Sequence, residues 1–388
     1  MVNIILLGLT SLFTDIASEM VYPLVPFFLL GTLGAGPALL GLIEGIAESI
    51  ASLLKVFSGY ISDRLGRRKG LTIVGYAASA LGKITLAAAA QSGAVFCARV
   101  LDRLGKGIRT APRDALIAES ARSGSSGAAF GLHRAMDSTG AVIGVLFAYL
   151  IIAGGGSDYR RVFLWSIVPA LFGVALLFRL ADTARSSGRS AHLPELRWRI
   201  LPKKLRRFLL VAFLFTLGNS SNAFLLLRTS EAGVAPQGVL LLYLVYNLFY
   251  ALSAYPAGKI ADLLGQRFVL VTGYCLYGLV YFGFTRINPA AADWLPWVLF
   301  SIYGLYSGLT DGVEKSLVSE LAPTEVRASA MGVHASIVGI GLLPASLIAG
   351  VLYQKIGPDA PFILGGILGL AASAGIAIAL RHERNFSP

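Results

Sequence analysis

The sequence predicts an all-α polytopic membrane protein whose twelve transmembrane helices form two pseudo-symmetric six-helix bundles. Of its 388 residues, 55% are hydrophobic and only 14% are charged, and the mean hydropathy is +0.71. This composition is too apolar for a soluble protein, and the length suffices for about twelve spans of roughly 20 residues. Residue patterns that recur about half a chain apart indicate the two bundles.

Twelve apolar segments are separated by Gly, Pro and charged residues, and each predicts one helix. In the first half they lie near 4–30, 38–61, 70–91, 94–118, 127–153 and 161–180. In the second half they lie near 207–229, 237–261, 268–287, 294–319, 328–353 and 361–381. We therefore expect an N-terminal bundle at 1–180, a basic linker at 181–206 and a C-terminal bundle at 207–388.

The basic residues gather in the loops that join even-numbered helices to the next odd-numbered one. Because Lys and Arg are retained on the cytoplasmic side, we expect both termini and the linker in the cytoplasm and the protein in the cytoplasmic (inner) membrane. Topology thus explains the net charge of +12, and no nucleic acid partner is expected. The loop residues are Arg64, Arg67, Arg68 and Lys69, then Arg122, Arg267 and Arg327, with a further run between Arg179 and Arg207.

A short loop between the second and third helices combines two glycines with a cluster of charges. Its sequence is Gly59-Tyr60-Ile61-Ser62-Asp63-Arg64-Leu65-Gly66-Arg67-Arg68-Lys69. Glycine lets two backbones approach closely, and Asp63 can accept hydrogen bonds from backbone N–H groups or from an arginine. The Gly, Asp, Gly and Arg recur at the same spacing as Gly258, Asp262, Gly265 and Arg267.

A second set of residues repeats in the same way, so that the fourth and fifth helices correspond to the tenth and eleventh. Leu116, Glu119, Ala121, Gly131 and His133 recur as Leu317, Glu320, Ala322, Gly332 and His334. We expect the two histidines to hydrogen-bond where the two halves meet, because the nearby glycines permit close packing there.

The charged loop resembles the signature loop between helices 2 and 3 of the major facilitator superfamily of secondary transporters. Its second copy resembles the weaker counterpart between helices 8 and 9, and the hydropathy pattern extends the resemblance over nearly the whole chain. The resemblance implies two like-oriented bundles with a substrate path between them near the bilayer midplane. We expect a conformational latch that holds the halves closed on the cytosolic side, formed by Gly59, Asp63, Arg64, Gly66, Arg67 and Arg68, with Asp262 and Arg267 in the second copy.

Charged residues inside the predicted helices locate the expected cavity, because an unpaired charge within a bilayer is costly. Uncharged asparagines add polarity to the seventh and eighth helices. The acids and bases are Asp15 and Glu19 in the first helix, Glu44 and Glu48 in the second, Asp102, Arg103, Lys106 and Arg109 in the fourth, and Asp311 and Glu314 in the tenth; the asparagines are Asn219, Asn222 and Asn247.

The fourth helix carries a polar stripe that we expect to face one wet cavity. Five bases cannot all pair with two acids inside one helix, so the surplus must face other acids, an anionic substrate, or both. We place the acids of the first two helices first, because buried bases need counter-charges. The stripe covers an arc of about 140° and consists of Arg99, Asp102, Arg103, Lys106, Arg109, Arg113 and Asp114.

Asp15 and Glu19 lie one turn apart on one face of the first helix, ahead of Pro23 and Pro26, which should bend it. Carboxylates in a partly dry cavity can exchange protons near neutral pH, which makes this pair the expected proton carrier. We expect them to alternate between protons and the basic stripe, chiefly Arg103, Lys106 and Arg109. Permanent ion pairing is the alternative, and metal binding with the two histidines is a third, although no ligand-type spacing enforces it.

The sequence thus predicts a secondary transporter of a small solute or ion, coupled to protons, and not an enzyme. It contains no nucleotide-binding loop and no Gly-x-Ser-x-Gly or His-Glu-x-x-His motif, so no cofactor or bound metal is expected. The expected partners are a small-molecule or ion substrate, protons and the lipid bilayer, and the protein is expected to be a monomer.

The family's antiporter motif, Gly-x-x-x-Gly-Pro, is present only in part. Gly140 and Gly144 have the required spacing, but Val145 stands where the family has proline. The partial motif favours export, as in drug or metabolite efflux. Proton-coupled uptake, divalent metal ion transport and a non-transporting membrane sensor remain alternatives.

Cysteine labelling tests the predicted orientation. Ser125→Cys and Ser187→Cys should be protected from an impermeant thiol reagent added to whole cells, whereas Ser157→Cys and Asn288→Cys should react, as the distribution of basic residues requires. Reaction at position 187 without reaction at position 157 would contradict this topology.

Overall fold

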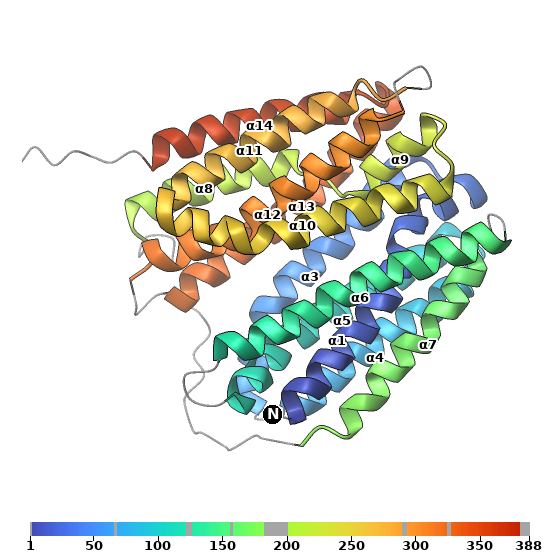
Figure 1. Cartoon of the computed structure of the whole chain (residues 1–388), viewed down its shortest axis with the longest axis horizontal. Coiled ribbons are helices and arrows are strands. Elements are labelled where there is room, and N and C mark those ends of the chain that lie inside the picture. Colours follow the sequence, from blue (N-terminus) through green and yellow to red (C-terminus); the bar gives the residue numbers. More distant parts are fainter. Residues whose placement is uncertain are drawn as a thin grey trace, which may run out of the picture.

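The computed structural model describes residues 2–65, 68–121, 126–155, 158–181, 201–288, 293–323 and 327–380. Within these ranges the chain forms helices and no strands, and the helices gather into two bundles (Figure 1). The all-α prediction is therefore confirmed. Most of the predicted linker 181–206, together with Gly66 and Arg67, lies outside the described residues.

The first bundle is built from α1 to α7. The first membrane segment is not one regular helix, because α1 (Val2–Val21) is followed by η1 (Tyr22–Leu24), α2 (Val25–Phe27) and the π-helical η2 (Phe28–Thr32). Pro23 and Pro26 lie in this region, and proline removes a backbone donor from a helix. The other helices are α3 (Pro37–Leu65), α4 (Arg68–Ala87), α5 (Ser92–Ser120), α6 (Ser126–Gly155) and α7 (Tyr159–Phe178).

The second bundle is built from α8 to α14, and it departs from the prediction at one place. The helix predicted at 207–229 is broken into α8 and α9, and residues 219–222 between them are not helical. Asn and Ser side chains compete for backbone hydrogen bonds, which explains the break. The helices are α8 (Lys203–Gly218), α9 (Ala223–Glu231), α10 (Pro236–Leu264), α11 (Gln266–Phe284), α12 (Leu295–Leu321), α13 (Arg327–Lys355) and α14 (Ala360–Ala379).

Nine helical segments among the described residues are long and apolar enough to cross a membrane. The remaining three long helices, α3, α5 and α12, fall short of that criterion, and each carries four or more charged residues, several of them in its interior. Charged groups in a membrane protein face the interior of the bundle or a wet cavity. The sequence therefore marks α3, α5 and α12 as interior helices.

The two bundles meet along α3 and α13, which pack closely through glycines. An added Cβ at Gly45 would lie 2.9 Å from the backbone oxygen of Leu343, and one at Gly350 would lie 2.6 Å from that of Pro37. At Gly41 an added Cβ would overlap the backbone oxygen of Ser346. Small residues allow such close approach of helices in a membrane.

The bundles lie closer together at the ends remote from the termini. Their ribbons diverge toward the side where α1 begins and α14 ends, which we call the terminal side (Figure 1). On the opposite, distal side, the backbone N–H of Ala38 donates to Oε1 of Gln354 across the two halves at 3.2 Å. The Tyr22 hydroxyl lies 3.3 Å from Oγ of Ser221 in the second bundle. The structure is thus closed on the distal side.

A methyl group added between α3 and α13 should destabilise this closed arrangement. We expect Gly41→Ala to lower the stability of the folded protein by about 1–3 kcal/mol, because the added methyl group overlaps the backbone of α13. The measurement is the thermal unfolding midpoint of purified protein in nanodiscs. Gly93→Ala, whose added Cβ meets nothing within 4 Å, is the matched control. Equal midpoints for the two variants would show that this contact does not hold the halves together.

Candidate solute-binding cavity and its charged surroundings

A cavity of about 350 Å³ lies between the two halves, and the second bundle supplies most of its wall. Among the described residues, the first bundle contributes only Tyr22 and Glu48. The residues of the wall carry hydroxyl, amide and carboxyl groups and aromatic rings. From the second bundle it contains Phe215, Thr216, Asn219, Ser220, Ser221, Asn222, Tyr246, Tyr250, Tyr303, Tyr306, Ser307, Thr310, Asp311, Glu314, Val338 and Leu342.

The break between α8 and α9 forms one side of this cavity. Non-helical backbone is tolerated at membrane depth where it is buried in protein or lines a cavity. Other helices satisfy part of the freed backbone, since the Tyr277 hydroxyl donates to the Gly218 oxygen at 2.7 Å and the Ser221 N–H donates to Oγ of Ser346 at 3.2 Å. Broken helices of this kind commonly form substrate sites in transporters.

The predicted asparagines divide into two groups. Asn219 donates to the Tyr306 hydroxyl at 3.3 Å, and Asn222 accepts a hydrogen bond of 2.7 Å from Tyr303, so both belong to the cavity wall. Asn247 instead donates to the backbone oxygen of Tyr243 on its own helix at 3.0 Å and is not part of that wall. In this state it therefore lies outside the cavity where it was expected, because the side chain folds back along α10.

Tyrosines form a cluster that the sequence interpretation missed. Their rings are in contact across helices, with centroids 5.3 Å apart for Tyr246 and Tyr303 and 5.0 Å apart for Tyr277 and Tyr306. The signal was present in the sequence, because spacings of three and four residues place side chains on one helix face. The cluster consists of Tyr243, Tyr246 and Tyr250 of α10, Tyr274, Tyr277 and Tyr281 of α11, and Tyr303 and Tyr306 of α12.

Two ion pairs join α3 to the basic stripe of α5, and the first of them is almost fully buried. Arg99 binds Glu44 with two hydrogen bonds of 2.7 and 2.8 Å, and the two side chains are only 4% and 1% exposed. One turn further on, Arg103 binds Glu48 at 2.8 Å. Acids of the second membrane segment therefore neutralise two of the five bases.

The rest of the stripe faces α4, so the prediction of one stripe facing one wet cavity is wrong. Lys83 of α4 binds Asp102 at 2.6 Å and also donates to Ser18 of α1 at 3.0 Å. Arg109 is buried, donates to Oγ of Ser79, and lies 4.4 Å above the Tyr76 ring. An arc of about 140° is wide enough to contact two neighbouring helices. Lys106, by contrast, is exposed.

Asp15 and Glu19 do not contact the bases that were expected as their partners. Asp15 lies beside the carboxyl group of Asp137 in α6, which also accepts a hydrogen bond of 2.7 Å from Ser11. Glu19 accepts a hydrogen bond of 3.0 Å from Tyr243 of the other bundle. In this conformation, Arg103 and Arg109 are bound elsewhere. The expected direct pairing with them is therefore wrong for this state, because α3 and α4 lie closer to α5 than α1 does.

The two acids of α12 have different partners. Asp311 binds Lys315 at 2.7 Å and accepts a hydrogen bond of 2.9 Å from Tyr250, and Arg134 of the first bundle lies 3.9 Å away. Glu314 accepts a hydrogen bond of 2.9 Å from Tyr274, and its carboxylate lies 3.6 Å from Nε2 of His334. Asp311 thus takes part in a contact between the halves, whereas Glu314 does not.

The histidines do not occupy the interface at which they were expected. His334 is buried against Phe208 and Glu314, both in its own bundle. His133 is buried among charged groups of the first bundle, namely Arg113, Asp114, Arg134 and Asp137. Within the described ranges, no three His, Cys, Asp or Glu side chains gather as metal ligands would.

The family profile described as Major Facilitator Superfamily matches residues 7–227 and 208–387. The chain belongs to this superfamily. It is 37% identical over 380 residues to an uncharacterized MFS-type transporter of Methanocaldococcus jannaschii, covering 95% of this chain and 92% of the relative. It is 24% identical over 374 residues to the multidrug resistance protein MdtH of Salmonella arizonae, covering 94% and 90% of the two chains.

Solved structures of the superfamily share the fold at low sequence identity. The nucleoside transporter NupG matches with a TM-score of 0.80 at 12% identity, over 99% of this chain and 100% of NupG. A POT family transporter in complex with a thioalcohol-conjugated peptide matches with a TM-score of 0.80 at 13% identity, over 97% and 95% of the two chains. These likenesses show the superfamily fold and carry no information on the solute.

The described part of the superfamily signature loop makes contacts within its own bundle. Arg68 pairs with Glu119 of α5, and Gly59 packs against Ala111 of the same helix. In the second copy, Arg267 donates to the backbone oxygen of Ala377 at 2.6 Å, and Asp262 is exposed. The side chains of Asp63 and Arg64, like Gly66 and Arg67, lie outside the described residues, so the latch stays a prediction.

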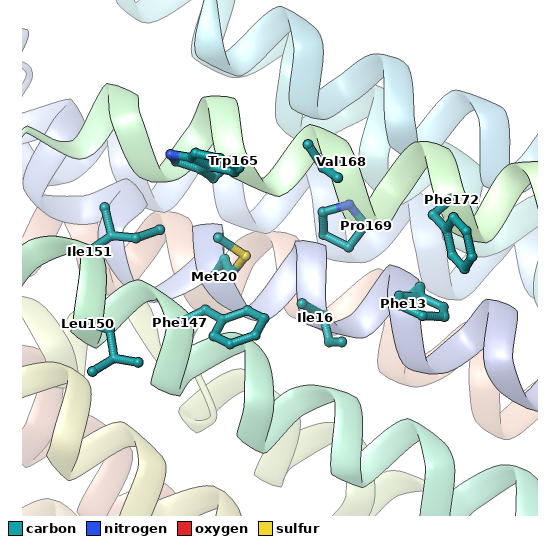
Figure 2. A pocket seen from close by; sticks show the side chains of 10 residues that line it. All are labelled: Phe13, Ile16, Met20, Phe147, Leu150, Ile151, Trp165, Val168, Pro169 and Phe172. Atoms are coloured by element: carbon teal, nitrogen blue, oxygen red, sulfur yellow. The ribbon is translucent and has the colours of Figure 1, made fainter.

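A second hollow, of about 530 Å³, has apolar side chains at every described position of its wall. Figure 2 shows it between α1, α6 and α7, with Trp165 and Phe172 on α7, Phe147 on α6, and Met20 on α1. Several of these side chains are exposed on the outer surface, including Trp165 at 61% and Phe172 at 51%. Such a surface suits contact with lipid chains, which leaves the polar cavity as the candidate site for a solute.

Removing one member of the Glu44–Arg99 pair should be far more harmful than removing both. Glu44→Gln removes the close, bidentate counter-charge of a buried guanidinium, which then retains only Asp102 at 3.7 Å, a carboxylate already paired with Lys83, and should cost about 3–5 kcal/mol of stability. The double variant Glu44→Leu with Arg99→Met should recover most of that loss, because the unpaired charge is gone. The measurement is the unfolding midpoint and the folded yield in detergent, with the exposed Glu320→Gln as control. Equal losses for the single and double variants would contradict the pairing argument.

Proposed function

We propose that this superfamily member is a secondary active transporter that exports a small organic solute in exchange for protons by alternating access. The observation that carries the proposal is the Glu19–Tyr243 hydrogen bond of 3.0 Å, which joins the two bundles across their interface. A rocking motion must break this contact. It therefore couples the accessibility of an acid to the movement of the halves.

The arrangement of the halves supports a cavity that is loaded from the terminal side. The distal side is closed by close helix packing, and the bundles diverge toward the termini (Figure 1). With both termini in the cytoplasm, as the basic loops favour, this state accepts solute from the cytoplasm. The multidrug resistance proteins among the relatives also favour export. Proton-coupled uptake and divalent metal ion transport are the alternatives.

Two further contacts support proton coupling through the first membrane segment. The Asp15 and Asp137 carboxyl groups lie side by side, and two adjacent carboxylates are most stable when they share a proton. The exposed Lys106 is close enough for its charge to act on both Asp15 and Glu19. We propose that it becomes their counter-charge when the proton leaves, and that the protein works as a monomer.

The signature loop completes the proposed cycle. We propose that Asp63 and its basic neighbours bind the second bundle when the terminal side closes, and that the loop of Asp262 contributes less because it lacks the run of arginines. Such a latch shifts the balance between two states without contacting the solute.

Everted membrane vesicles test the transport activity and can at the same time identify the solute. Vesicles with and without the protein are energised by an imposed pH gradient and incubated with a mixture of metabolites and drugs. Accumulated compounds are then identified by mass spectrometry. At least one compound should accumulate only with the protein, and a protonophore should abolish the difference. Accumulation in right-side-out vesicles alone would establish uptake instead, and no protein-dependent compound in either orientation would overturn the proposal.

The carboxylates of α1 should be required for coupling and not for exchange. We expect Asp15→Asn and Glu19→Gln to abolish gradient-driven accumulation of the compound so identified, while solute exchange without a gradient persists, because neither variant can carry a proton. Glu320→Gln, a neutralised exposed acid on α12, should behave as wild type. If both α1 variants still accumulate the compound against its gradient, the proton path lies elsewhere, at Glu44, Glu48 or Asp311.

A further inference from the structure

The charged side chains of the described cavity wall are all acidic. The described residues that line it include the carboxylates Glu48, Asp311 and Glu314, and they include no lysine, arginine or histidine. A wall of this kind attracts cations and repels anions, because in a partly dry site charges interact more strongly than in water. Anionic solutes such as phosphate esters and carboxylates are therefore disfavoured.

The three carboxylates are not equally available to a solute. Glu48 is neutralised by Arg103 at 2.8 Å, and Asp311 by Lys315 at 2.7 Å. Glu314 has a hydrogen bond from Tyr274 and the imidazole of His334 at 3.6 Å, and an imidazole carries no permanent charge. Its side chain is only 16% exposed. A largely buried carboxylate without a permanent counter-charge needs a cation.

Aromatic rings surround this carboxylate. Phe215 stacks on Tyr274, the hydrogen-bond donor to Glu314, with ring centroids 3.9 Å apart, and it lies 6.0 Å from Tyr306. Tyr246 and Tyr303 continue the aromatic wall at a centroid distance of 5.3 Å. The faces of such rings attract ammonium and other onium groups, most strongly where water is excluded. Carboxylate and rings together form a site for an organic cation.

We propose that the cavity binds an organic cation, with its amine or quaternary onium group beside Glu314 and an apolar or aromatic body against the tyrosines. This inference rests on the proposed function and names the class of solute that the transporter carries. The asparagines and serines of the α8–α9 break then contact the polar substituents of the solute. The ion pairs of Glu48 and Asp311 stay in place when the solute binds, since Glu314 supplies the counter-charge.

Equilibrium binding of radiolabelled tetraphenylphosphonium to the full-length protein in nanodiscs tests the proposal. Tetraphenylborate, which has a similar shape and the opposite charge, is the matched probe. The cation should bind saturably, and tetraphenylborate should not compete with it. Glu314→Gln should weaken cation binding by about 30-fold or more, whereas the exposed Glu320→Gln should leave it unchanged.

A second pair of variants isolates the aromatic contribution and does not depend on the folding of Glu314→Gln. Tyr246→Leu, which removes a ring from the wall, should weaken binding by about fivefold. Tyr246→Phe, which keeps the ring and removes the hydroxyl, should stay within about twofold of wild type. Tighter binding of tetraphenylborate than of the cation, or unchanged affinity in both Glu314→Gln and Tyr246→Leu, would overturn the proposal.

The binding assay and the vesicle assay test the two proposals independently, so a negative result in one does not decide the other. If the vesicles accumulate only neutral or anionic compounds, the protein is a transporter and the cation proposal is wrong. If tetraphenylphosphonium binding depends on Glu314 but no compound is moved, the site is supported and the transport proposal is overturned.

Discussion

The structure depends on the cost of placing charge in a membrane. Each intramembrane acid or base must find a partner or water, and this requirement determines which helices lie inside the bundles. Glu44 and Arg99 satisfy it with a bidentate pair that is almost completely buried. Helices α3 and α5 are too polar to face lipid, so their pairing fixes them at the centre of the first bundle. The apolar helices α4 and α7 can then cover the outside.

The two halves stabilise their intramembrane polar groups in different ways, although they share the same repeated pattern of residues. The first bundle is held by ion pairs, which are rigid because breaking one leaves a buried charge. Around the cavity, the second bundle uses mainly neutral hydroxyl and amide groups, from the tyrosine cluster and the broken helix at Asn219–Asn222, together with Asp311 and Glu314. Neutral polar groups can exchange one hydrogen-bond partner for another at low cost. The cavity therefore lies against the half whose contacts can change.

The interface between the halves also combines permanent and breakable contacts. Helices α3 and α13 approach so closely that glycine is required at Gly41, and such packing leaves no room for water. Most polar contacts described across the interface are single hydrogen bonds, as between Tyr243 and Glu19, and the ion pair of Arg134 with Asp311 is a long one of 3.9 Å. Single hydrogen bonds are worth about 1 kcal/mol each. A change of state can thus replace them one at a time while the two bundles move as units.

The sequence by itself determined the membrane class, the twelve helices and the two-fold repeat, and it singled out a minority of the polar residues that line the cavity, namely Glu48, Asn219, Asn222, Asp311 and Glu314. These follow from local composition and period, because a span of about 20 apolar residues can only be a helix in a bilayer. Even the tyrosine cluster was visible as spacings of three and four, although it was overlooked. The sequence did not show which side chain of a neighbouring helix each polar residue contacts. Helical period gives the direction of a side chain within its own helix, whereas the neighbour in that direction depends on how the helices pack. Only the tertiary structure therefore decided that Arg109 faces Ser79, that Glu19 meets Tyr243, and that Glu314 lacks a permanent counter-charge.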